Sequence, residues 1–563
     1  MEEKENIKYN ATQYLVAMLK AYGIKNIVAS PGTQNAYFNS IVQDDSFFYC
    51  YSVVDERSAC YVATGISFET CEPVAITCTG ATASRNYLSG MTEAHHRNLP
   101  IIAITFYDLN TEEYKLSPQF VDRSVTQNDV KKLSVNLPYI NNNQEKNNCL
   151  IYLNAALSNA KYNGYPVHIN APNSMEFFSQ KDLPEDIWTT QLYTQVDNSI
   201  EEELKGKRTA IYIGSHNKIS KETENAISAF AENYNIPVIV DHTSNYHGKN
   251  KFISSQVTVL GNVKKRPELI IDIGGISGEY ASYSFIKSAI LWRISPNHDF
   301  RARAGKPVVK QFNMSEHDFF KSFKGKSGDN SYLEYIKNAL AKVVIPELPL
   351  SNPFVCQELS KHIPQNSSLH LAILNSLRSM NFFNPDESID INCNVGGFGI
   401  DGALSTLFGQ SLVNPNKKVF GVVGDLAFFY DMNILGNRHL GKNIRILLVN
   451  NNRGEEFRLN PKLEEPLENK TDILIAASGH YKNGAKLWAE SCGLQYMRAE
   501  NKEEFLTQIE DFCKKDFSKS VVFEVFTTNE DEQKAINLLR NLSSQKVKIK
   551  EKKSFLQKIF KLK

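Results

Sequence analysis

The 563-residue chain lacks several features that mark exported, membrane-bound and zinc-binding proteins. Its nine cysteines are scattered, with no Cys-x-x-Cys pair and no cysteine–histidine spacing typical of a zinc site. The longest apolar runs have only the length of a strand, and the first ten residues, MEEKENIKYN, are charged where a signal peptide is apolar. These absences predict a cytoplasmic protein with reduced thiols.

The chain also has almost no net charge. Sixty-three lysines and arginines stand against 62 acids, so no overall field favours nucleic acid, and we predict no such partner. Charge accumulates only in residues 540–563, which hold nine basic residues and one acid. This charged stretch fits either a solvated terminus or a short amphipathic helix in weak contact with an anionic membrane. The apolar residues of that helix would be Phe555, Leu556, Ile559, Phe560 and Leu562.

What is present is the composition of an ordinary globular protein, with 42% hydrophobic and 22% charged residues, long enough for three or four domains. From residue 11 onward, helical and strand periodicities alternate, a pattern typical of parallel sheets covered on both faces. We therefore predict an α/β fold of three consecutive doubly wound parallel-sheet domains. The predicted domains are residues 1–182, 183–345 and 346–532, followed by a basic tail at 533–563 that contains the charged stretch. Predicted strands include 26–29, 52–54, 74–78 and 101–106, then 209–213, 236–240 and 269–273, then 418–423, 444–449 and 521–526.

In doubly wound sheets, ligands bind at the carboxyl ends of strands, so the loops there are the candidate sites. In the first domain, Ser30, Pro31 and Gly32 follow a strand in a turn that presents backbone amides. Glu56, in VDERS, lies between a strand and a helix, a position suited to proton transfer. The same glutamate could instead act only as a favourable charge at a helix N-terminus.

The middle domain gives a weaker signal. Gly274 and Gly275 in GGISGE follow a predicted strand, but the full dinucleotide-binding pattern is absent. We predict no flavin cofactor for this domain.

The third domain carries the most informative pattern. A predicted strand ends at Gly424 and Asp425, and the next ends about 26 residues later at Asn450, Asn451 and Asn452. Carboxylate and amide oxygens from neighbouring strand ends suit Mg²⁺, which takes further ligands from phosphate. Upstream, residues 394–402 (NVGGFGIDG) hold four glycines before a predicted helix, which allows a ligand to approach the backbone closely.

These residues resemble a known family. GDL followed by NNN is similar to the thiamin-diphosphate motif, and SPG, VDERSA and CTGATA are similar to the N-terminal half of the same superfamily. Within it, the chain resembles most the menaquinone-pathway 2-succinyl-5-enolpyruvyl-6-hydroxy-3-cyclohexene-1-carboxylate synthases, and the acetolactate synthases more distantly. The resemblance covers about 530 residues, although the middle domain shares only the general alternation of helices and strands and no motif. It implies the thiamin-diphosphate-binding fold, with thiamin diphosphate and Mg²⁺ as cofactors.

The resemblance also implies residue roles. Glu56 would hydrogen-bond the aminopyrimidine ring and so help remove the C2 proton of the thiazolium, and Gln119 would lie near the reacting centre. Asp425 and Asn451, with the backbone carbonyl of Arg453, would hold Mg²⁺ against the diphosphate. The implied cofactor-binding residues are Pro31, Gly32, Thr79, Asn86, Gly396, Gly397, Phe398, Gly399, Ile400, Gly424, Asp425, Leu426 and Asn451.

The implied reaction is decarboxylation of a 2-oxo acid and transfer of the resulting carbanion to an acceptor. The superfamily builds its site from the first domain of one subunit and the third of another, so we predict a homodimer or homotetramer. An alternative is a non-catalytic homologue that only binds the cofactor.

Two departures bear on the substrate. Gln34 and Val395 stand where the synthases have arginines that face substrate carboxylates, and neither side chain can supply that charge. Four other arginines in or near the motif loops could bind an acidic substrate instead: Arg85, Arg438, Arg453 and Arg458. We therefore keep two interpretations, a carboligase with a different substrate pair and the menaquinone-pathway synthase itself.

Overall fold

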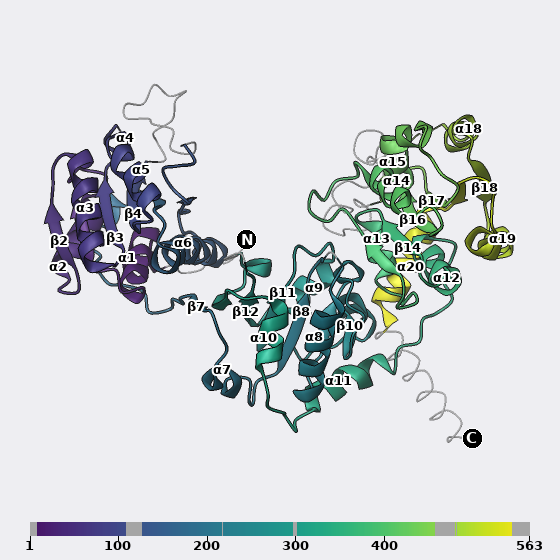
Figure 1. Ribbon diagram of the computed structural model, residues 1–563, viewed down its shortest axis with the longest axis horizontal. Coiled ribbons are helices and arrows are strands. Elements are labelled where there is room, and N and C mark those ends of the chain that lie inside the picture. Colours follow the sequence, from purple (N-terminus) through teal and green to yellow (C-terminus); the bar gives the residue numbers. More distant parts are fainter. Residues whose placement is uncertain are drawn as a thin grey trace, which may run out of the picture. The chain divides into compact units, whose positions relative to one another are not determined.

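The computed structural model contains three parallel sheets flanked by helices, which confirms the predicted fold class (Figure 1). It describes residues 8–80, 82–108, 127–216, 218–296, 301–455, 479 and 481–542. The chain divides into two compact units, residues 1–195 with 290–314 and residues 196–289 with 315–563. None of the helices in the described ranges is both long and apolar enough to cross a membrane. The domain boundaries proposed from the sequence stay a prediction.

The first sheet has six strands in the order β2-β1-β3-β4-β6-β5, and every neighbouring pair is parallel. Its strands are β1 (Asn26–Ala29), β2 (Tyr49–Ser52), β3 (Val74–Cys78), β4 (Ile101–Tyr107), β5 (Leu133–Asn136) and β6 (Val167–Pro172). Its helices are α1 (Ala11–Ala21), α2 (Ala36–Asp44), α3 (Glu56–Thr70), α4 (Ala83–Asn86), α5 (Leu88–Arg97) and α6 (Asn143–Asn163).

Strand β4 shows how this sheet is buried on both faces. Ile102 and Ile104 pack with α1 and α6, whereas Ile101 and Ala103 pack with α3 and α5, as the alternation of strand side chains requires. The first of these helices, α1, begins at a capping box in which Asn10 and Gln13 bond each other's backbone. The continuous apolar runs of the sequence therefore correspond to strands with a helix layer on each side.

The middle sheet has seven strands in the order β10-β9-β8-β11-β12-β13-β7. The pairs from β10 to β11 and from β12 to β7 are parallel. Its strands are β7 (Gln191–Tyr193), β8 (Thr209–Ile213), β9 (Val238–Val240), β10 (Lys251–Ile253), β11 (Leu269–Ile273), β12 (Ile290–Ile294) and β13 (Val308–Phe312). Its helices are α7 (Asn198–Glu202), α8 (Lys221–Asn233), α9 (Tyr280–Phe285), α10 (Glu316–Ser322) and α11 (Ser331–Leu340).

The third sheet has the order β15-β14-β16-β17-β19-β18, again with parallel neighbours. Its strands are β14 (Ser368–Leu371), β15 (Asp390–Asn392), β16 (Val419–Gly424), β17 (Ile444–Asn450), β18 (Gln495–Ala499) and β19 (Val521–Phe526). Its helices are α12 (Asn352–His362), α13 (Asn375–Met380), α14 (Ala403–Val413), α15 (Asp425–Asp431), α18 (Gly484–Ser491), α19 (Lys502–Lys514) and α20 (Asn529–Arg540). Short helical turns occur at η2 (Met175–Phe177), η3 (His242–Ser244), η4 (Gln256–Leu260), η5 (Arg303–Gly305) and η6 (Met432–Gly436).

The first and third sheets have the same topology. Numbered from its own first strand, each has the order 2-1-3-4-6-5. Residue identity does not reveal this relation, because only burial and connectivity are common to the two sheets. In both sheets the loops at the carboxyl edge are the candidate ligand sites, as is usual in such folds.

Candidate active site

The carboxyl edge of the third sheet brings Asp425 and Asn451 together. Gly424 of β16 is in register with Val449 of β17, so the residues that follow the two strands emerge side by side. Asp425 is the first residue of α15, whereas Asn451 and Arg453 lie in the turn after β17. All three line a cavity of about 230 Å³, together with Gly424, Leu426, Ala427 and Val449.

Asp425 is a carboxylate in an apolar wall. Its side chain is buried, and this burial raises the pKa of Asp425 to about 7, although backbone N–H groups, including that of Arg453, bond the carboxylate and lower it. In the adjoining turn, the N–H of Arg453 donates to Oδ1 of Asn451 at 3.2 Å. A buried carboxylate is costly to ionise without a cation close by, so the site favours a bound positive charge.

This donor set fits the implied cofactor. The Asp425 carboxylate, the Asn451 amide oxygen and the Arg453 carbonyl are oxygen ligands of the kind Mg²⁺ takes, and diphosphate oxygens would complete the sphere. In the described ranges, no three or more His, Cys, Asp or Glu side chains are grouped to hold a metal ion. The fit therefore depends on a single carboxylate supplemented by amide, carbonyl and phosphate oxygens.

The glycine-rich loop at 394–402 is closed at its base. Nδ2 of Asn394 donates to the carbonyl of Gly402 at 3.2 Å, and the hydroxyl of Thr406 donates to Oδ1 of Asn394 at 3.2 Å. Within the loop, Phe398 has a φ of +58° and Ile400 lines the cavity.

The predicted glycines of this loop are not part of the cavity lining. A Cβ on Gly396 or Gly397 would meet nothing within 4 Å, whereas one on Gly399 would collide with Asp401. Of the five predicted loop residues, the structure thus places Ile400 at the cavity.

The sequence analysis missed a further wall of the cavity. Residues 372–376, after β14, line it, and Leu374 among them has a φ of +71°, a strained value for a residue with a side chain. Glu532 of α20 also lines it, where burial raises the pKa of Glu532 to about 8 and the N–H of Asn352 donates to both carboxylate oxygens at 2.9 and 3.0 Å. No glycine or motif marks these positions in the sequence.

In the first unit, Glu56 is the first residue of α3. Asp55 caps this helix by accepting from the N–H groups of Arg57 and Ser58. Glu56 itself is partly exposed, and its Oε2 accepts from Nδ2 of Asn86 at 2.9 Å. Glu56 therefore lies at a helix N-terminus, and a hydrogen bond connects it to Asn86, the other residue predicted for the site.

The other predicted residues of the first unit lie at the same sheet edge. A Cβ on Gly32 would collide with Cγ2 of Thr79, so the loops after β1 and β3 are in contact. Asn35 holds the first loop through the N–H of Gly32 and the carbonyl of Ser30. Pro31, in this loop, is exposed. Gln119 lies outside the described residues.

The two departures from the family pattern have structural roles. Oε1 of Gln34 accepts from the N–H of Gly80 at 2.7 Å and so ties the two loops together. Val395 is buried against the middle-sheet segment that contains Gly278, where a Cβ would lie 3.0 Å from Val395 Cγ1. These positions hold the loops in place.

The candidate arginines are in different environments. Arg453 is buried, with Nε 3.9 Å from Oε1 of Glu455, whereas Arg85 and Arg438 are exposed. Arg458 lies outside the described residues. The guanidinium of Arg453 thus forms an ion pair with Glu455, a buried carboxylate of the same chain.

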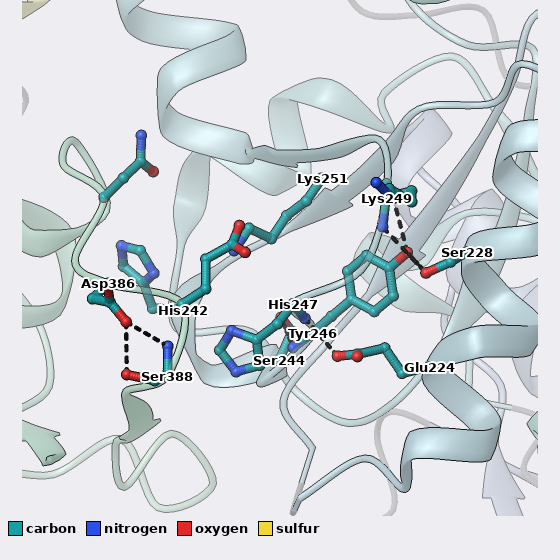
Figure 2. Close-up of polar contacts among 12 residues, drawn as sticks. Glu224, Ser228, His242, Ser244, Tyr246, His247, Lys249, Lys251, Asp386 and Ser388 are labelled. Atoms are coloured by element: carbon teal, nitrogen blue, oxygen red, sulfur yellow. Dashed lines mark hydrogen bonds and ion pairs between the residues drawn. The ribbon is translucent and has the colours of Figure 1, made fainter. Parts of the chain in front are cut away.

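His242 follows β9 at the carboxyl edge of the middle sheet, and Figure 2 shows it beside the loop after α13 that carries Asp386 and Ser388. The N–H of His242 donates to Oδ1 of Asn381 at 3.2 Å, and its Nε2–H donates to the carbonyl of Phe383 at 2.9 Å. Nδ2 of Asn381 also donates to Glu279, the last residue of GGISGE, at 3.1 Å. The GGISGE segment therefore contacts the third domain through the hydrogen bond between Glu279 and Asn381.

Comparison with known proteins agrees with this geometry. The family described as thiamine pyrophosphate enzyme, N-terminal TPP binding domain, matches residues 9–132. The chain is 30% identical over 544 residues to the 2-succinyl-5-enolpyruvyl-6-hydroxy-3-cyclohexene-1-carboxylate synthase of Bacteroides thetaiotaomicron, covering 91% of this chain and 95% of that protein. This chain belongs to that synthase family.

Other members of the synthase family show similar coverage. The Bacteroides fragilis synthase is 29% identical over 538 residues, covering 91% of this chain and 95% of the relative. The Flavobacterium psychrophilum synthase is 25% identical over 568 residues, covering 95% and 99%. Because the similarity spans nearly the whole of each relative, the chain is a thiamin-diphosphate-dependent enzyme.

Proposed function

We propose that this enzyme decarboxylates a 2-oxo acid and transfers the resulting carbanion to an acceptor, with thiamin diphosphate held by Mg²⁺. The observation that carries the proposal is the cavity at the third sheet, which combines a buried carboxylate with the side-chain amide of Asn451. When bound, thiamin diphosphate supplies the electron sink for the carboxyl loss.

The chain's own residues would hold and activate the cofactor. Asp425, Asn451 and the Arg453 carbonyl would bind Mg²⁺, and Ile400, which lines the same cavity, would contact the cofactor. The Glu56 carboxylate would form a hydrogen bond with a ring nitrogen of the pyrimidine. Asn86 would orient this carboxylate through the 2.9 Å hydrogen bond that its Nδ2 donates to Oε2 of Glu56.

We further infer that each site is completed by a second copy of the chain, as in the superfamily. In and before α3, the helix that Glu56 begins, the first unit exposes the large apolar side chains of Val54, Tyr61, Val62 and Phe68. The third domain also exposes large apolar side chains near its cavity helices, Leu412, Val413 and Tyr430. Such surfaces are typical of faces covered by a partner.

The relatives' name supplies the first candidate product. On that basis the reaction is formation of 2-succinyl-5-enolpyruvyl-6-hydroxy-3-cyclohexene-1-carboxylate, from 2-oxoglutarate and isochorismate. A second candidate is a carboligation with less acidic substrates. It is favoured by Gln34 and Val395, since the first is engaged by Gly80 and the second is buried and apolar.

One experiment separates the two candidates. The purified enzyme, with thiamin diphosphate and MgCl₂, is assayed for CO₂ release from a panel of 2-oxo acids, and products with added acceptors are identified by mass spectrometry. Robust product formation from 2-oxoglutarate and isochorismate supports the first candidate. Release of CO₂ only from other 2-oxo acids supports the second. Absence of decarboxylation by an enzyme shown to bind the cofactor would contradict both.

A further inference from the structure

A second cavity, of about 270 Å³, lies in the second unit at the amino edge of the middle sheet. Thr209, the first residue of β8, lines it, as does Ile236, two residues before β9. The remaining walls come from residues 201–208 and from residues 326–332, which lead into α11. The cavity is therefore built from segments more than a hundred residues apart, and none of its residues belongs to the cofactor site.

Two Lys-Gly-Lys tripeptides converge on this cavity. Residues 205–207 form one and residues 324–326 the other. Lys205, Lys207 and Lys326 line the cavity together with Arg208, against two acidic side chains. The cavity walls therefore carry an excess of positive charge.

Two of these four cationic side chains have no acidic partner among the residues that the structure describes. Lys205 and Arg208 each pair with a glutamate outside the cavity lining, at 2.5 and 3.1 Å. Lys207 and Lys326, by contrast, have no acidic side chain within ion-pair distance in the described parts of the chain. Two unpaired ammonium groups around one concave space repel each other and favour a bound anion.

The two acids of the cavity are already engaged by the protein. Glu201 accepts from the hydroxyl of Tyr234 at 2.5 Å. Asp329 accepts from the N–H of Ser331 at 2.9 Å, at the start of α11. Neither carboxylate forms an ion pair with Lys207 or Lys326 in the described parts of the chain, so the two ammonium groups stay available to a ligand.

The wall that carries Lys326 is fixed in position. A Cβ on Gly325 would collide with the carboxylate of Glu201, so the loop packs directly on this side chain of α7. The N–H of Ser327 donates to the carbonyl of Asn233 at 2.8 Å, and Nδ2 of Asn235 donates to the carbonyl of Ser327 at 2.7 Å. The loop is thus anchored to the end of α8, and the cavity is pre-formed.

We propose that this cavity binds a small anion that carries a phosphate group. Lysine ammonium groups act as point charges that suit a compact anion with several oxygens. Arg208 is the side chain best shaped to grip a carboxylate with two parallel bonds, but its guanidinium is occupied by a glutamate and by the carbonyl of Arg266 at 3.1 Å. Tyr234 and Tyr332 provide an aromatic back wall for the organic part of such a ligand.

The proposal is tested with inorganic phosphate as the probe. The full-length enzyme is saturated with thiamin diphosphate and Mg²⁺, so that the cofactor cavity is filled, and freed of unbound ligand. Phosphate binding is followed by ³¹P NMR line broadening. We expect saturable binding that weakens as NaCl is raised, since salt screens exposed charges. We expect the double variant Lys207→Gln/Lys326→Gln to bind phosphate roughly tenfold more weakly.

A matched control is the double variant Lys249→Gln/Lys287→Gln. It removes two charges from the same domain but from residues outside the cavity lining, and it should bind phosphate as the unmodified enzyme does. Both variants should keep the decarboxylase activity, which shows that they fold. Equal phosphate binding by the two double variants would overturn the proposal, as would succinate binding at least as tight as phosphate.

Discussion

Glu56 combines two roles that a local sequence cannot separate. It lies in the first turn of α3, where a negative charge is stabilising, and it also accepts a hydrogen bond from Asn86 at the predicted cofactor edge. Loss of the negative charge should leave the reaction rate unchanged if the glutamate only stabilises the helix, and should lower the rate if the glutamate takes part in proton transfer.

We predict that Glu56→Gln lowers the decarboxylation rate by at least about 100-fold, the range found when a positioned acid–base group is lost. Cofactor binding, measured by isothermal titration calorimetry, should be nearly unchanged because the proposed diphosphate site is the cavity at the third sheet. The control is Glu69→Gln, on the same helix but outside the predicted site. If Glu56→Gln keeps full activity, the residue serves only the helix.

His370 makes stability depend on pH. The side chain is buried in β14, and neither ring nitrogen has a hydrogen-bond partner within the described residues. Burial lowers the pKa of His370 to about 4, whereas an unfolded histidine titrates near 6.5. Between these values the unfolded chain binds more protons, so the free energy of unfolding falls as the pH falls.

From this side chain alone, the free energy of unfolding should decrease by about 2 kcal/mol between pH 7 and pH 5. His242 adds to the loss in the same window, because burial also lowers the pKa of His242 to about 4. We predict that His370→Leu reduces the acid loss, measured by urea unfolding at the two pH values. The exposed His439→Leu should leave the loss unchanged. Identical losses in all three proteins would exclude His370 as a cause.

At the scale of elements, the GGISGE segment links the middle sheet to the cofactor cavity. A Cβ on Gly278 would lie 2.6 Å from Leu377, 3.0 Å from Val395 and 3.1 Å from Ile373. Ile373 lines the cavity, and Val395 begins the glycine-rich loop. An added methyl group must therefore displace side chains that shape the cofactor site.

We predict that Gly278→Ala lowers the free energy of unfolding by roughly 1–3 kcal/mol, the usual cost of overpacking. It should also weaken thiamin diphosphate binding, with kcat largely restored at saturating cofactor, as isothermal titration and steady-state kinetics would show. Gly409→Ala is the control, because nothing lies within 4 Å of its Cβ. Unchanged cofactor affinity in Gly278→Ala would show that the segment does not shape the site.

Elements also differ in how far the sequence predicts them. The sequence predicts the strands at 26–29 and 74–78 correctly because each contains a run of buried apolar residues. Strand β2, Tyr49–Ser52, was expected at 52–54, since it is a sheet edge with all four residues exposed and has no burial pattern to reveal it. Likewise, Leu374 and Glu532 reach the cavity only through the contacts of the folded chain.

At the scale of the whole molecule, the Glu56 and Asp425 half-sites belong to different compact units. If each active site combines the first unit of one protomer with the second unit of its partner, as proposed, two inactive variants should complement each other. In a mixed dimer of Glu56→Gln and Asp425→Asn, one site receives both substitutions and the other receives neither.

We therefore predict that mixing the two inactive variants under conditions of subunit exchange restores about a quarter of the unmodified activity, because half of the dimers are mixed and each has one intact site. Sedimentation velocity would establish that the proteins self-associate. No recovery despite proven exchange would contradict the shared site. Mixing Glu56→Gln with the unmodified enzyme controls for effects of exchange itself.

The sequence alone was enough to predict the parallel sheets, the cofactor class and the family. Apolar runs and strand-end motifs are local patterns, so they can be recognised in the sequence before the tertiary structure is known. The sequence could not decide which loops meet. Three features depend on residues that are far apart in the chain. They are the common strand order of the first and third sheets, the packing of Gly278 against Ile373 and Val395, and the cavity lined by residues of two Lys-Gly-Lys segments. Such contacts arise only when sheets pack, since packing depends on shape and burial over the whole domain.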